Sequence, residues 1–124
     1  MFRKFVGSFS DIHHSNPPDP VLLASPVSFH EIMDEINFLV RENFLRKMLE
    51  DKLRLLSREG YIFVYATVDK RVEGDRSSLI EVDEKGLFAV RGDEKLLVYR
   101  VVLRHHYVEG RLMYSSKHLV PEPV

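Results

Sequence analysis

Residues 28–60 read SFHEIMDEINFLVRENFLRKMLEDKLRLLSREG, and this stretch shows where the chain builds its core. It begins with a capping box, because the Ser28 hydroxyl can accept a hydrogen bond from the Glu31 amide while the Glu31 carboxylate reaches back to the Ser28 amide. It ends with Arg58, whose charge suits the negative end of a helix, and Gly60, which suits the left-handed turn that closes one. The sequence therefore predicts helical structure across this stretch.

Two rows of apolar residues follow one another inside the stretch, each at the spacing of three or four positions that a buried helix face requires. The first row is Phe29, Ile32, Met33, Ile36, Val40, Phe44 and Met48, and the second is Phe38, Leu45, Leu49, Leu53 and Leu56. The change from the first row to the second near residues 41–43 fits either one helix with a wide apolar face or two helices. The pattern is longer than an average helix, which favours a break or kink there.

After Gly60 the pattern changes to that of strands. Residues 61–68 are apolar on both faces, which is typical of a central strand, and residues 69–77 predict a polar loop. The remaining predicted strands are 79–82, 86–90, 95–107 and 111–120, with turns at 83–86, 92–93 and 109–110. The expected fold class is α+β, with one long or kinked helix, or a helix pair, packed on an antiparallel sheet of about five strands.

The chain of 124 residues fits one domain. We expect residues 1–20 to form an N-terminal arm with a proline-rich linker, because three prolines at positions 17–20 favour an extended connection. Residues 21–124 then form the single α+β domain. Gly7 and Ser8 interrupt the apolar run near the N-terminus, so we expect no signal peptide.

Composition narrows the functional classes only a little. The net charge of −1 gives no overall electrostatic reason to bind nucleic acid or a membrane surface. The chain has no cysteine, which excludes a disulfide framework and is compatible with a cytoplasmic location. No apolar run approaches the roughly 20 residues that cross a bilayer, so no membrane partner is expected. The absence of Gln and Trp beside many charged residues is typical of heat-adapted proteins and predicts a high melting temperature.

The C-terminal hairpin carries the candidate binding site. A loop of two or four residues pairs Tyr107 with Leu112 and gathers the apolar residues of both strands on one face. The opposite face would then carry the basic residues Arg100, Arg104, His106, Arg111 and Lys117. One interpretation is a cationic face that grips the phosphates of DNA or RNA. The other is a solvated face whose cations pair with nearby acids and discourage edge-to-edge aggregation.

The sequence predicts no catalytic residue, no metal and no cofactor. His105 and His106 point to opposite faces of a strand, and the predicted register separates His118 from His105 by roughly 13 Å, which is too far for two ligands of one zinc ion. The glycines are scattered singly, so they form no phosphate-binding loop, and no nucleophile stands beside an evident base. The absence of these motifs favours a non-enzymatic protein.

Two functional hypotheses follow, and a weaker third. The first is a small, homo-oligomeric binding protein that contacts DNA or RNA through the basic face of the hairpin. The second is a homo-oligomeric protein-interaction or assembly module with no nucleic-acid role, in which the apolar arm and helix face contact a second copy or another protein. The third is a ligand-binding or catalytic cavity between helix and sheet, around His105 and Tyr114.

Overall fold

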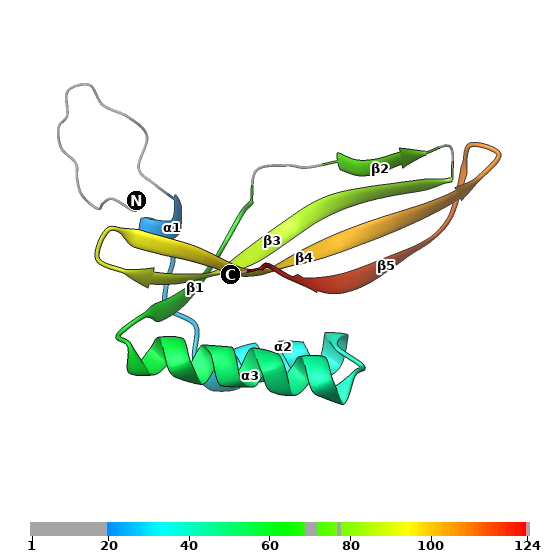
Figure 1. The fold of residues 1–124 in the computed structure, drawn as a ribbon. Coiled ribbons are helices and arrows are strands. Elements are labelled where there is room, and N and C mark those ends of the chain that lie inside the picture. The colour runs from blue at the N-terminus through cyan, green and yellow to red at the C-terminus, as the bar shows by residue number, and fades with distance from the viewer. Residues whose placement is uncertain (1–19, 69–71, 77, 124) are drawn as a thin grey trace, which may run out of the picture.

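The computed structural model describes residues 20–68, 72–76 and 78–123 (Figure 1). Of the predicted arm and linker at 1–20, residues 1–19 lie outside the described residues, and Pro20 begins a helix. The helices are α1 (Pro20–Leu23), α2 (Phe29–Leu39) and α3 (Asn43–Arg58). The strands are β1 (Ile62–Ala66), β2 (Val72–Arg76), β3 (Leu79–Arg91), β4 (Glu94–Val108) and β5 (Arg111–Pro121). The α+β class with an antiparallel sheet is confirmed, whereas the predicted strands match the observed ones only roughly.

The long helical stretch forms two helices, with the break at the predicted place. α2 closes at Val40, whose backbone is extended and whose N–H still bonds to the Ile36 carbonyl at 2.8 Å. The capping box at the start of α2 is confirmed: Glu31 N lies 3.1 Å from Ser28 Oγ, and Ser28 N lies 3.2 Å from Glu31 Oε1. The chain leaves α3 through Gly60, at φ +93°, as the sequence predicts.

The break gives each helix its own buried row. α2 and α3 bury Ile32, Ile36, Leu49, Leu53 and Leu56 against the sheet. Three residues of the predicted apolar rows are instead exposed: Phe38 by 80%, Phe44 by 79% and Met48 by 43%. A single wide apolar face is therefore wrong, because α3 starts in a new direction and turns the second row, rather than the first, towards the core.

The sheet order is β1-β3-β4-β5, and β2 pairs with the end of β3 that β1 does not reach. Figure 1 shows α2 and α3 packed on one face, α1 on the opposite face beside β1, and the turn between β4 and β5 projecting past the helices. We call α2, α3, β1 and residues 85–101 the helix-covered half, and residues 103–117 the distal hairpin.

The prediction that residues 61–68 form a central strand is wrong, because β1 lies at the edge of the sheet. Both faces of β1 are apolar because each face packs in a separate core. Phe63 packs in the main core under α2 and α3, while Val64 packs with Val21 of α1 and with Val90 in a second, smaller core on the other face. The short helix α1, which the sequence analysis did not predict, therefore supplies the cover that a neighbouring strand would give.

The predicted turn at residues 83–86 is also wrong, because β3 continues through it with a bulge at Glu84. The predicted loop at 69–77 contains β2. The charges that suggested a turn are neutralised inside the fold: Asp83 bonds to Arg100 and Lys85 to Glu35, each at 2.6 Å. Gly86 serves close packing, since a Cβ there would lie 2.6 Å from the Val68 side chain and 2.7 Å from that of Leu97.

Candidate functional site

The distal hairpin closes with the two-residue turn that the sequence predicts. Glu109 and Gly110 both have positive φ, at 49° and 77°, as a type I′ turn requires. Tyr107 pairs with Leu112, which confirms the predicted register at the turn.

A bulge then changes which side chains share a face. His106 pairs with Tyr114, so Met113 is an extra residue on β5. Beyond the bulge Lys117 pairs with Leu103, on the side of the sheet that carries the buried Val101. The prediction that Lys117 shares one face with the other basic residues is therefore wrong. Those that do lie together, opposite the helices, are Arg100, Arg104, His106 and Arg111.

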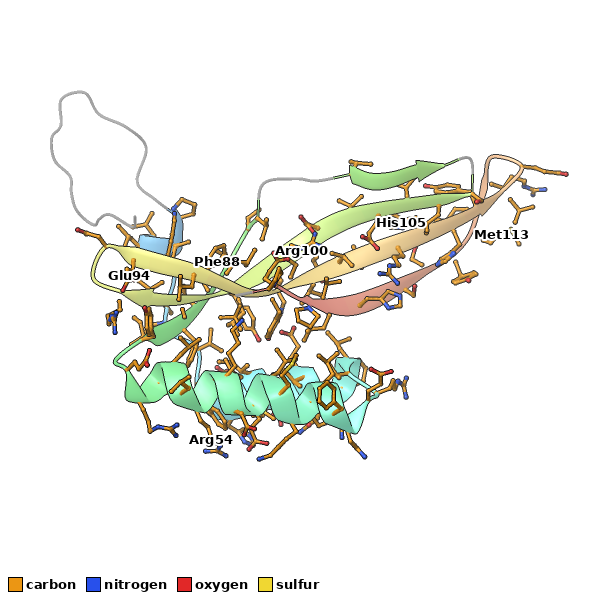
Figure 2. The ribbon with its side chains drawn as sticks, viewed as in Figure 1. Arg54, Phe88, Glu94, Arg100, His105 and Met113 are labelled. Carbon is orange, nitrogen blue, oxygen red and sulfur yellow. The ribbon has the colours of Figure 1, made fainter. Side chains whose placement is uncertain are left out.

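Acidic residues accompany the cations of this face. Arg100 is buried, and it donates to Asp83 and to Glu122, each at 2.6 Å. Burial lowers the pKa of Arg100, but these two carboxylates outweigh it and raise the pKa above its ordinary value. Arg104 pairs with Glu81 across the strands. Figure 2 shows Arg100 at the middle of the sheet, where the ion pairs hold β3, β4 and the C-terminal residues together.

Lys117 lies on the helix side of the sheet and also has an acidic partner, because its Nζ lies 3.3 Å from Glu84 Oε1. Arg100, Arg104 and Lys117 therefore each have a carboxylate within ion-pair distance. The arrangement matches the second interpretation of the hairpin, in which the charges pair within the protein.

His105 on β4 and His118 on β5 each bond to a neighbouring serine rather than to one another. His105 Nδ1 lies 2.7 Å from Ser115 Oγ, and His118 Nε2 lies 2.8 Å from Ser116 Oγ. The bulge puts His118 opposite Val102, so His118 lies on the other face of the sheet from His105. Burial and the nearby Arg104 charge lower the pKa of His118, which favours the neutral ring. Among the described residues, no three His, Asp or Glu side chains are grouped so that they could hold a metal ion.

The tip of the hairpin is apolar and exposed. Val108, Leu112, Met113 and Tyr114 are each between 55% and 60% exposed. Figure 2 shows Met113 at the far end of the hairpin, away from both helices. A shallow hollow of about 420 Å³ lies here, lined by Val108, Glu109, Arg111, Leu112 and Met113. Tyr114 stacks on His106, with ring centroids 4.2 Å apart and planes at 13°.

A second polar cluster, which the sequence analysis missed, joins α2 to the sheet. Glu35 Oε1 accepts hydrogen bonds from Tyr65 and Tyr99, both at 2.7 Å, and Glu35 Oε2 lies 2.6 Å from Lys85 Nζ. The sequence signal was weak: an acid beside the buried Ile36 in α2, and tyrosines on the helix side of two strands.

The pKa shifts in this cluster indicate a structural role, in which it holds α2 against the sheet. Burial raises the pKa of Glu35, but the bonds from Lys85, Tyr99 and Tyr65 outweigh burial and hold the pKa below its ordinary value. Burial and the Glu35 carboxylate raise the pKa of both tyrosines, so their hydroxyls keep their protons at neutral pH. The carboxylate is saturated with donors and the phenols are poor acids, so the cluster offers no free base or nucleophile.

Comparison of the chain with protein-family models, curated proteins and solved structures finds no match in any of the three. None of the helices in the described part of the chain is long and apolar enough to span a membrane.

Proposed function

We propose that this chain is a non-enzymatic protein-interaction module that associates with copies of itself through the distal hairpin. The observation that supports this most directly is the exposed apolar tip formed by Val108, Leu112, Met113 and Tyr114. Single exposed apolar side chains are common, but adjacent ones at a projecting end are characteristic of contact sites. Covering them would remove apolar surface from water, worth about 25 cal/mol per Å².

The ion pairs of the basic face also favour a protein partner over nucleic acid. Phosphates would have to compete with Glu81 for Arg104, and with Asp83 and Glu122 for the buried Arg100. Breaking such a pair leaves a carboxylate without its cation, which opposes binding. An apolar partner surface meets no such obstacle at the tip.

Nucleic acid is the second candidate, and one observation favours it. The exposed Tyr114 ring stacks on His106, on the face that also carries Arg104 and Arg111, and bases stack on such aromatic platforms. The residues at stake would be Arg100, Arg104, His106, Arg111 and Lys117. A labelled single-stranded oligonucleotide, titrated at two salt concentrations, tests this candidate, because phosphate contacts weaken steeply as salt rises. Binding that is lost in Tyr114→Ala would support it.

Sedimentation velocity over a range of protein concentrations tests the main proposal. We expect an oligomer in the wild type and a shift to monomer in Leu112→Ser/Met113→Ser. The matched control is Met48→Ser/Leu55→Ser, which removes the same two residue types from exposed positions on α3, outside the hairpin. A wild type that stays monomeric at every concentration, or a control that dissociates as much as the hairpin variant, would contradict the proposal.

A further inference from the structure

The sheet edges at β1 and β5, the two ends of the strand order, differ in what lies beside them. Along β1, the Val27 N–H donates to the Phe63 carbonyl at 2.7 Å, and Pro26 forms a bridge with Val64. The segment before α2 thus occupies that edge. Along β5, no strand among the described residues pairs with the outer side. The edge of β5 therefore presents a row of backbone donors and acceptors to solvent.

β5 also lacks most features that protect an edge from pairing. It is 11 residues long, it contains no acidic residue, and its proline stands at the last position, Pro121. The side chain of its lysine, Lys117, bonds to Glu84 across the face of the sheet. The bulge at Met113 disturbs only the end near the turn, so residues 114–120 form a regular strand. Long, regular and unprotected edges pair readily with another strand.

We infer that β5 pairs antiparallel with β5 of a second copy of this chain, about a two-fold axis that passes through Ser116. The inference rests on the proposed self-association and specifies its geometry. A two-fold axis perpendicular to the sheet leaves every side chain on its own face. Because directly opposed residues share a face, the axis lies midway between the two copies of one residue. With Ser116 on the axis, Ser115 faces the partner's Lys117, and Tyr114 faces the partner's His118.

The side chains of β5 select this register among its neighbours. With Ser116 on the axis all 11 residues of β5 overlap, and Arg111 and Lys117 each face an uncharged residue. An axis through Lys117 would set two ammonium groups directly opposite one another, and like charges across strands are destabilising. An axis through Ser115 would set Met113 opposite Lys117 and shorten the overlap.

The same register covers the exposed tip. Leu112 of one copy, on the helix side of the sheet, comes diagonally beside Leu119 of the other. On the opposite face the exposed Tyr114 meets the partner's His118 ring, whose lowered pKa favours the neutral form. Aromatic and apolar pairs across antiparallel strands are stabilising. One continuous sheet then spans both copies, with the α2 and α3 helices of both on one face.

Single cysteines test the register directly, because the chain has none of its own. Directly opposed residues of an antiparallel pair have Cα atoms about 4.5–5.5 Å apart, which a disulfide can bridge. We expect Ser116→Cys to lose its monomer band on a non-reducing gel after mild oxidation of dilute protein. Ser115→Cys should keep its monomer band, because the two copies of residue 115 lie diagonally. The matched control is Ser57→Cys, at an exposed position on α3.

A charge exchange at the same position gives an independent test. Ser116→Lys and Ser116→Glu should each sediment as a monomer, because each sets like charges on the axis, and an equal mixture of the two should recover the dimer. Circular dichroism of each variant confirms folding, and Ser116→Cys decides the matter if either charged variant unfolds.

The possible outcomes separate the two proposals. An oligomer in which Ser116→Cys stays unlinked, or in which Ser115→Cys links instead, overturns the Ser116 axis and leaves self-association standing. A wild type that is monomeric at all concentrations overturns both. Cross-linking of Ser116→Cys that is lost when Leu112 and Met113 are changed to serine supports both.

Discussion

Strand β4 passes through two different environments, one buried beneath the helices and one partly exposed in the distal hairpin. In the helix-covered half, Tyr99 and Val101 are fully buried between α2, α3 and the rest of the sheet. In the distal hairpin the same strand is partly exposed and ends at the exposed Val108. Cross-strand ion pairs and the His106–Tyr114 stack support that end, and its apolar tip residues are exposed.

The largest expected effect is the loss of a core leucine. Leu53 of α3 is fully buried, so Leu53→Ala should lower the free energy of unfolding by about 2–5 kcal/mol through lost burial and a cavity. Leu112→Ala, the same change at an exposed position in the distal hairpin, should cost at most about 0.5 kcal/mol in the monomer. Urea unfolding of both variants measures the difference, and similar losses would remove the contrast between the two halves.

The next effect comes from the cluster that ties α2 to the sheet. Glu35→Gln should lower the free energy of unfolding by about 1.5–3 kcal/mol, because it removes the charged acceptor for Tyr65, Tyr99 and Lys85. Glu109→Gln is the matched control, since Glu109 lies exposed at the hairpin turn.

The Glu35 contribution should also depend on pH. The pKa of Glu35 is lower in the folded chain than its ordinary value of 4.5, so the folded state binds this proton less readily than the unfolded state. The stabilisation is therefore complete above about pH 4.5 and is lost as pH falls through the folded-state pKa. Unfolding measured from neutral to acidic pH should show the wild type and Glu35→Gln converging in acid. A constant gap would argue against a charged Glu35.

A smaller effect is expected at the start of α2. Ser28→Ala removes the side-chain acceptor for the Glu31 amide and should cost about 1 kcal/mol. Ser57→Ala, near the end of α3, should change the free energy of unfolding by less than about 0.5 kcal/mol, because the capping preference belongs to the N-terminus of a helix. Thermal unfolding of the pair gives the comparison. Equal losses would mean that the capping box contributes nothing.

The smallest effect belongs to the stacked rings of the distal hairpin. A double-mutant cycle with His106→Ala and Tyr114→Ala should give a coupling energy of about 0.2–1 kcal/mol, typical of cross-strand pairs. A cycle on a distant pair, such as His106 with Phe44, should give none within error. A coupling energy comparable to the Leu53→Ala loss would show that the hairpin is held as firmly as the core.

Local signals account for the parts of the fold that the sequence predicts well. The capping box at Ser28, the left-handed Gly60 and the turn that pairs Tyr107 with Leu112 each involve residues within a few positions of one another. Such features depend on short-range geometry, which the sequence displays directly.

The errors come from interactions between distant parts of the chain. Asp83 and Lys85 resemble turn residues until Arg100 and Glu35 neutralise them inside the fold. The bulge at Met113 has no local sign, and it alone moved Lys117 to the other face of the candidate site. Register and ion pairing, rather than hydrophobic pattern, therefore limited the prediction of the site.

The bulge has a consequence for chain length. Because Met113 is the extra residue between Leu112 and Tyr114, deleting it would leave a regular ladder in which Leu119 still faces the core. Deleting Ser115 instead would shift everything after it by one place and turn Leu119 out of the core. Deletion of residue 113 therefore shortens the hairpin near its turn and leaves the pairing of residues 114–121 with β4 unchanged.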